Sequence, residues 1–185
     1  MLLALLLTGA VVPAAKADFV SPYALGDFTL VNSTPSDNGT AITPDGGRTV
    51  VLTGPNDGSG LPGFTELTIL SRGTGLFRFD YVYTSLDTPN GDFAGYILNG
   101  RVVPLASASG QSGTVSVAVR PGDRIGFRID TVDNIGEPGV LTISNFSAPA
   151  AAPTTMPTLS TAAALVLAVL LSGSALLLLK RGARV

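Results

Sequence analysis

The side chains in this sequence that could do chemistry are carboxylates and neutral oxygen groups, because it contains no histidine and no cysteine. Its lysines, Lys16 and Lys180, lie near the two ends. These absences exclude a Ser-His-Asp triad, a cysteine nucleophile, a Ser-Lys dyad and a histidine-ligated zinc site from the region between them. Catalysis by carboxylates alone stays open, but no acid/base pair stands out. We therefore expect a protein that is not an enzyme.

Two segments rich in Asp and Asn could bind calcium, which takes about six to eight oxygen ligands from flexible loops. The candidate ligands are Asp87, Asn90 and Asp92 in one segment, and Asp130, Asp133, Asn134 and Glu137 in the other. Neither segment has EF-hand spacing, and Asp and Asn are also ordinary turn residues. Calcium is the one cofactor that the sequence suggests, with turn formation as the alternative.

Two further patterns could indicate ligand binding. Gly58, Gly60 and Gly63 have the spacing of a dinucleotide loop, but Pro62 and a strand-like segment stand where that loop needs a helix. We therefore interpret them as a flexible loop. The four tyrosines could form a platform for a sugar ring, with a place in the core as the alternative; they are Tyr23, Tyr81, Tyr83 and Tyr96.

The charge of the central region is negative. All 13 acidic residues lie between Asp18 and Glu137, where they meet seven arginines and no lysine, so this span has a net charge of −6. Such a balance does not favour binding to nucleic acid or to an anionic lipid surface. It is also the ordinary charge of a soluble exported domain.

The hydrophobic pattern of residues 18–147 predicts one all-β domain. About eight segments rich in Val, Ile, Thr, Phe and Tyr are bounded by Gly, Pro, Asn and Asp, and several alternate between apolar and polar residues. We expect strands at Arg48–Leu52, Glu66–Ser71, Leu76–Tyr83, Phe93–Leu98, Arg101–Leu105, Thr114–Val119, Arg124–Asp130 and Val140–Phe146. Asn99-Gly100 predicts a two-residue hairpin. Together they predict an antiparallel two-sheet sandwich or jelly roll.

The N-terminal segment, residues 1–17, is typical of a secretory signal peptide. The apolar stretch Leu2–Val12 is too short to span a bilayer, which takes about 20 residues. Ala15 and Ala17 supply the small residues that a signal peptidase requires. We expect cleavage before Asp18.

The C-terminal segment predicts a membrane anchor. Residues 148–155 form a Pro/Ala/Thr linker, and the uncharged stretch Leu159–Leu179 is long enough, at ~1.5 Å per residue, to cross the ~30 Å hydrocarbon core. Lys180, Arg181 and Arg184 follow at once, which indicates that the tail stays in the cytoplasm and the domain lies outside. We expect a single transmembrane helix.

Residues 156–185 resemble the IPTL-CTERM protein-sorting signal of Gram-negative bacteria. The resemblance includes Pro157, Thr158, Leu159 and Ser160 of the motif Met156–Ser160, which leads into the apolar stretch, and the basic end at Lys180 and Arg181; Met156 stands where the family has Ile. It implies that an exosortase-like membrane protease cuts near the motif and transfers the protein elsewhere. The alternative is a simple membrane anchor.

The segment Phe93–Phe146 is also similar to ectodomains that accompany such tails, with Gly95–Gly100, Gln111–Val115, Gly122–Phe127 and Leu141–Phe146 as the similar stretches. That similarity implies a jelly-roll-like sandwich without an assigned activity. The sequence therefore predicts an exported, non-enzymatic protein of the cell surface or extracellular matrix. One alternative is a membrane-tethered module that binds calcium or carbohydrate, and another is a carboxylate-based hydrolase.

Overall fold

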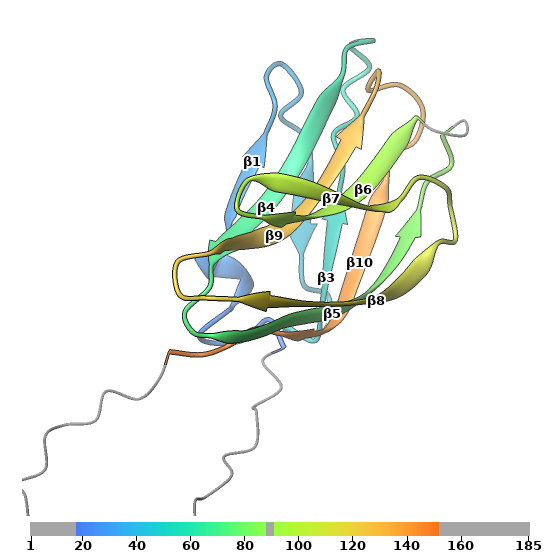
Figure 1. Ribbon diagram of the computed structural model, residues 1–185. Coiled ribbons are helices and arrows are strands. Elements are labelled where there is room, and N and C mark those ends of the chain that lie inside the picture. The colour runs from blue at the N-terminus through green and yellow to red at the C-terminus, as the bar shows by residue number, and fades with distance from the viewer. Residues whose placement is uncertain (1–17, 88–90, 152–185) are drawn as a thin grey trace, which may run out of the picture. The chain divides into compact units, whose positions relative to one another are not determined.

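The computed structural model describes residues 18–87 and 91–151, which form a two-sheet antiparallel β-sandwich (Figure 1). A short 3-10 turn, η1 (Leu25–Asp27), precedes the strands. The strands are β1 (Thr29–Asn32), β2 (Thr40–Ile42), β3 (Thr49–Thr53), β4 (Gly63–Leu70), β5 (Gly75–Thr84), β6 (Asp92–Leu98), β7 (Arg101–Ala106), β8 (Ser112–Val119), β9 (Arg124–Thr131) and β10 (Val140–Ser147).

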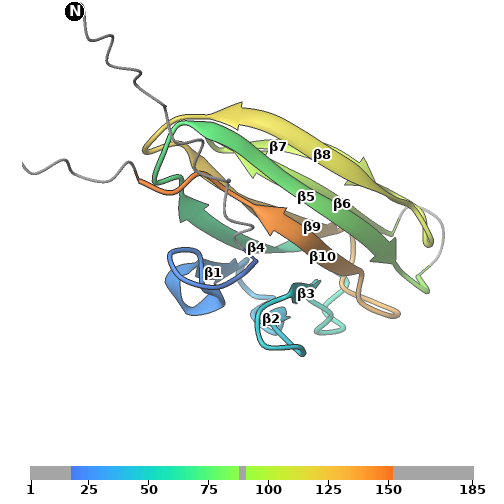
Figure 2. The same ribbon diagram turned by 90° about the horizontal axis from the view of Figure 1, so that it is seen from below.

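The order of the strands is that of a jelly roll with one added strand in each sheet. The first sheet has the order β1-β4-β9-β6-β7, and the second has the order β2-β3-β10-β5-β8. Without β1 and β2, the remaining eight strands alternate between the sheets as in a jelly roll, except that the hairpin strands β6 and β7 are neighbours in the first sheet. The two layers are visible in Figure 2, where β5, β8 and β10 lie in front of β4, β6 and β9. The prediction of an antiparallel sandwich is confirmed.

The core lies between the sheets and is rich in aromatic rings. Phe127 is fully buried, and its ring lies 4.9 Å from that of Phe79 and 5.8 Å from that of Phe77, centroid to centroid. Ile125 and Ile129 are buried on the same side of β9. The alternation predicted for β9 is therefore confirmed, with its apolar residues inside and its charged residues outside.

The predicted hairpin between β6 and β7 is also confirmed. Asn99 and Gly100 have φ angles of 53° and 81°, the positive values that a two-residue turn of this kind needs at both positions. The turn is joined to the neighbouring β8–β9 turn, since Asn99 N donates to Arg124 O and Arg124 N donates to Asn99 Oδ1, at 2.8 and 2.9 Å.

Successive connections lie at opposite ends of the sandwich because the strands are antiparallel. We call one end the terminal end; it carries the connections 43–48, 71–74, 99–100 and 120–123 and the two ends of the described chain. Tyr23 Oη donates to Pro149 O there, at 2.7 Å. We call the other the loop end; it carries the connections 33–39, 54–62, 107–111 and 132–139 and the described residues 85–87 and 91.

The structure adds two strands that the sequence pattern does not predict, β1 and β2. Both are short edge strands with mostly exposed residues, so they lack the alternation that marks the others. No helix among residues 18–87 and 91–151 has the length and apolar character needed to cross a membrane. The predicted signal peptide and transmembrane helix lie outside the described residues.

Candidate functional site

The outer side of the first sheet carries a row of charged and polar side chains. Alternation places the side chains of Glu66 and Thr68 on β4, and of Arg124, Arg128 and Asp130 on β9, on this side. Their neighbours in the sequence, such as Phe127, point into the core. A row of charged groups therefore crosses the sheet on the side that faces away from the second sheet.

The charged groups of this row are paired with one another. Glu66 accepts from Arg124 Nη2 at 2.7 Å and from Arg128 Nη1 at 3.4 Å, while Asp130 Oδ1 accepts from Arg128 Nη2 at 2.7 Å. The Arg128 guanidinium also lies 3.8 Å above the centre of the Phe64 ring. The Glu66 side chain is only 14% exposed, so these pairs are partly shielded from water and hold their side chains in place.

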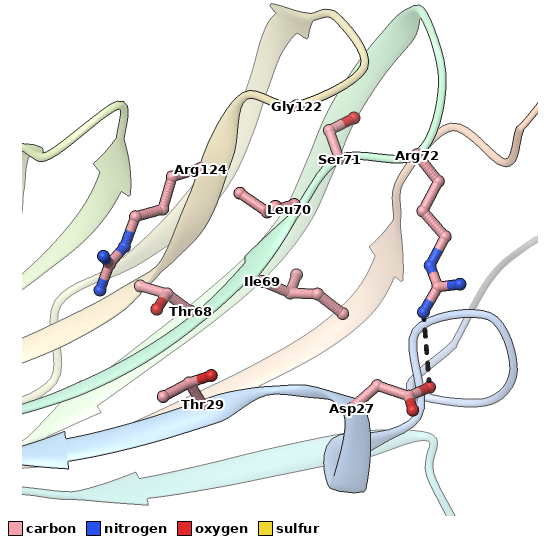
Figure 3. A pocket seen from close by; sticks show the side chains of 9 residues that line it. All are labelled: Asp27, Thr29, Thr68, Ile69, Leu70, Ser71, Arg72, Gly122 and Arg124. Carbon is pink, nitrogen blue, oxygen red and sulfur yellow. Dashed lines mark ion pairs between the residues drawn. The ribbon is translucent and has the colours of Figure 1, made fainter.

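An open hollow of about 530 Å³ adjoins this row at the terminal end. Figure 3 shows its lining residues: Asp27, Thr29, Thr68, Ile69, Leu70, Ser71, Arg72, Gly122 and Arg124. Arg124 lies on one side of the hollow, the Arg72–Asp27 pair lies on the other, and Leu70 lies between them. The lining therefore combines hydrogen-bond donors, acceptors and apolar surface.

The two sides of the hollow differ in how firmly they are held. Arg124 is fixed by its short contact with Glu66, whereas the Arg72 and Asp27 charges are 3.9 Å apart and their side chains are 44% and 46% exposed. An exposed pair at that distance contributes little to stability. It can open at low cost, so its guanidinium and carboxylate are available to a ligand.

A second, smaller hollow of about 280 Å³ lies on the same sheet, by β6 and β7. Its lining includes Phe93, Val102 and Pro104 as apolar groups and Asp130 as its carboxylate. The charged row thus extends from the first hollow, through Arg124, to the second, through Asp130. Among the lining residues of each hollow there is a single carboxylate.

The predicted calcium ligands are only partly brought together. The Asp87 carboxylate packs against Gly136, so the two predicted segments do meet at the loop end. Asp130 points to the outer side of the first sheet, where it binds Arg128, and Asp133 Oδ1 accepts from Ile135 N at 3.1 Å in a local turn. Glu137 is exposed. Within residues 18–87 and 91–151, no three or more acidic, Cys or His side chains are grouped to hold a metal ion.

Asp92 is the buried member of that set. It is 4% exposed and accepts from Ser85 Oγ at 3.2 Å. Burial raises the pKa of this carboxyl above its ordinary value, and hydrogen bonds from Thr131, Ser85 and the Gly139 backbone oppose the shift only in part. Burial and the neighbouring Asp92 also raise the pKa of the Tyr83 hydroxyl.

The other groups that the sequence suggested as ligand-binding have structural positions in the fold. Tyr23 and Tyr83 are fully buried, and Tyr81 and Tyr96 pack partly buried against the core, so the tyrosines form no sugar platform. The glycines of the 54–62 connection lead into strand β4 and not into a helix, as expected. The predicted sorting motif, the basic cluster and the signal cleavage site lie outside the described residues.

Sequence reasoning did not identify the residues of the first hollow. Asp27, Thr68, Arg72 and Arg124 are spread over almost a hundred positions and form no motif. The signal that was available is the alternation in β9, which places Arg124 and Arg128 on the outer side. Without the strand order, that pattern does not show that Glu66 lies beside them.

No protein-family model matches the chain, and no curated protein sequence matches it. Solved structures similar to it include a variant of the carbohydrate-binding module CBM29-2, with 18% identity, a TM-score of 0.38, and coverage of 72% of this chain and 90% of that one. Another is a family 35 carbohydrate-binding module from Clostridium thermocellum, with 15% identity, a TM-score of 0.33, and coverage of 64% and 92%. A third is CBM35 from Paenibacillus barcinonensis, with 18% identity, a TM-score of 0.30, and coverage of 68% and 96%.

Proposed function

We propose that the sandwich is a non-catalytic module that binds a glycan on the outer side of its first sheet. The observation that carries the proposal is the first hollow, in which hydroxyl, guanidinium and carboxylate groups surround apolar surface. A sugar ring has the matching chemistry, since its hydroxyls both donate and accept hydrogen bonds and its C–H faces pack on aliphatic side chains. Ligand sites generally combine such apolar surface with a few converging polar groups.

Each group in the hollow has a defined part in this proposal. Arg124 is held in position by Glu66 and offers its remaining N–H groups to sugar hydroxyls. Asp27 accepts from hydroxyls and Arg72 donates to them once their 3.9 Å pair opens. Thr68 adds a hydroxyl beside Leu70, which supplies apolar surface.

The same geometry favours binding over hydrolysis. A glycosidase of the usual kind needs two carboxyl groups about 5–10 Å apart on either side of the scissile bond. The lining of the first hollow contributes Asp27 alone, and Glu66 beside it is bonded to two arginines. The domain is therefore a binding module in this proposal: it releases its ligand without a chemical change.

We further propose that the module is exported and held at the membrane by Leu159–Leu179, and that an exosortase-like protease reads Met156–Ser160. It would then serve at the cell surface or in the extracellular matrix. The meeting of both described chain ends at the terminal end supports this proposal, because a tether there leaves the loop end and the outer sheet exposed. Mass spectrometry of the mature protein would test it, with cleavage before Asp18 expected and an intact Met1 as the contrary result.

The sorting step has a separate test. Alanine at Pro157, Thr158 and Leu159 should leave membrane insertion intact, because the apolar length is nearly unchanged, but should block release from the membrane. A simple anchor would behave alike with and without these changes.

Affinity electrophoresis of residues 18–151 through gels that contain soluble polysaccharides tests the glycan proposal. Loss of a charge-assisted hydrogen bond is worth about 1.5–3 kcal/mol, so Arg124→Ala should weaken retardation about tenfold or more. Thr68→Val removes a hydroxyl at nearly constant shape and should also weaken it. Ser116→Ala, on the exposed side of β8 in the other sheet, is the control and should migrate as the wild type does. Equal retardation of all four proteins, or none with any polysaccharide, would overturn the proposal.

A further inference from the structure

The charges of the domain are sorted between its two ends. The loop end carries six acidic residues and no Lys or Arg, counting its connections and the first residue of β6: Asp37, Asp57, Asp87, Asp92, Asp133 and Glu137. The terminal end carries five arginines in its connections or in the first residue of the strand that follows: Arg48, Arg72, Arg101, Arg120 and Arg124. Four aspartates accompany these arginines: Asp18, Asp27, Asp45 and Asp123. The negative net charge of the domain is therefore concentrated at one end.

At the loop end, hydrogen bonds join separate connections into one surface. Asn134 is buried with a φ of 54°; its Nδ2 donates to Leu61 O at 2.6 Å, and its O accepts from Gly58 N at 2.8 Å. Asn56 Nδ2 donates to Gly136 O, while the Asn38 side chain bonds the Asn56 backbone twice, donating from Nδ2 to Asn56 O and accepting at Oδ1 from Asn56 N. These bonds hold the 33–39, 54–62 and 132–139 connections against one another.

The loop end also exposes large aliphatic side chains. Leu61 is 50% exposed, Leu86 is 84% exposed and Ile135 is 54% exposed. The Ile135 Cδ1 atom lies 3.9 Å from the position that a Cβ on Gly60 would occupy, so Leu61 and Ile135 belong to adjoining connections. Exposed apolar groups with a polar rim are a feature of surfaces that bind a partner.

We infer that the loop end docks on the terminal end of a second copy of this chain, so that the domains associate head to tail. The docking surface on the terminal end is the pair of joined turns that carries Arg101 and Arg120, together with Leu76, which is 47% exposed and pairs in the sheet with Ala118. Acidic and aliphatic groups of one copy then meet basic and aliphatic groups of the next. These turns adjoin the glycan hollow at Gly122 and Arg124, but the contact does not require a bound glycan.

The charges of the two ends favour a head-to-tail contact between copies over a symmetric contact between two loop ends. Two loop ends would bring like charges together, whereas a loop end and a terminal end attract each other. A contact between two different surfaces of the same chain does not close by two-fold symmetry, so it can continue as an open string of domains. The end of a small sandwich offers less than the ~800 Å² per partner of a standard interface, so the association is expected to be weak and concentration-dependent.

Sedimentation velocity of residues 18–151 tests the inference, since both sheets and the whole core lie within this unit. At low salt the weight-average sedimentation coefficient should rise between about 10 µM and about 1 mM, the range in which weak interfaces assemble. The rise should shrink at about 0.5 M salt, because charges screen over about 10 Å at 0.1 M and over less at higher salt. A coefficient that stays constant over this range at low salt overturns the inference.

Two charge-reversed variants make the test specific for a head-to-tail contact. The loop-end variant is D37R/E137R, whose positions flank the bonded Asn38–Asn56–Gly136 group, and the terminal-end variant is R101E/R120E. Each alone should stay monomeric, because it has lost one of the two surfaces. In an equimolar mixture the intact loop end of the second variant meets the intact terminal end of the first, and the two reversed surfaces are again of opposite charge. The mixture should therefore regain the association that each variant alone has lost.

Controls separate this outcome from loss of folding or from a general charge effect. Each variant should melt within a few degrees of the wild type, and Ser116→Glu and Ser116→Arg, in the middle of exposed β8, should associate as the wild type does. I135S should reduce association at both salt concentrations, since it removes apolar and not charged surface. A mixture that stays monomeric, or a loop-end variant that still associates alone, contradicts the head-to-tail contact.

Discussion

Replacing Phe127 with alanine is the sharpest test of the packing that holds the two sheets together. The side chain is fully buried, and its ring meets that of Phe79 edge to face at 89°, with Phe77 and Phe19 at centroid distances of 5.8 and 6.4 Å. A Phe→Ala change in a core costs about 3–5 kcal/mol, and each aromatic pair adds about 0.5–1.5 kcal/mol beyond buried area. We expect a value in the upper part of that range, about 4–5 kcal/mol.

Urea unfolding at 25 °C, followed by circular dichroism, measures this loss. A domain of this size is stable by about 5–15 kcal/mol, so the variant should lose about a quarter or more of its stability and melt about 12–25 °C lower. Leu76→Ala is the matched control on an exposed strand position and should change the free energy of unfolding by less than about 1 kcal/mol. A loss below about 1 kcal/mol for Phe127→Ala would show that β9 presents its other face to the core.

Three further predictions concern a strand glycine, a buried carboxylate and calcium. Gly126→Ala should destabilise the domain strongly, because a Cβ there would lie 2.1 Å from Leu67 O on the neighbouring strand, whereas Gly26→Ala, with no atom within 4 Å, should be nearly neutral in the same unfolding assay. Asp92→Asn should stabilise the domain more at pH 7 than at pH 4, as measured by thermal melts at the two pH values. The raised pKa of Asp92 means that its charged form is penalised in the folded state. This penalty disappears as the pH falls through the raised pKa towards the ordinary value of 3.8. An advantage that grows on acidification would show the opposite sign. Millimolar calcium and a chelator should give the same melting curve, because Asp130 and Asp133 already bind groups of the chain itself; a clear rise in melting temperature with calcium would reveal a site.

The strands that the sequence predicted are those with a buried or partly buried face. In β9 the apolar residues at every second position could be assigned to the core because a two-residue period has one structural meaning. The turn at Asn99-Gly100 was equally clear, since few residue pairs accept positive φ at both positions. Strands β1 and β2 were not predicted because each pairs with one neighbour at a sheet edge and leaves most of its residues exposed.

The candidate site could not be predicted, because it depends on which strands are neighbours. Glu66 and Arg128 are opposite each other in the β4–β9 register, although 62 positions separate them in the chain. The separation of charge between the ends has the same origin. Along the sequence, acidic and arginine-containing connections simply follow one another, and antiparallel pairing then sends alternate connections to opposite ends.

The most direct test of the central claim is an NMR titration of labelled residues 18–151 with oligosaccharides from the polysaccharide that retards the domain best. The glycan account predicts that amide shifts concentrate at Thr68, Leu70, Arg72, Gly122 and Arg124, around the first hollow. They should disappear in the Arg124→Ala variant while its other resonances stay in place. Shifts confined to the loop end or to the exposed side of β8, or none at saturating oligosaccharide, would contradict the claim that this hollow binds glycan.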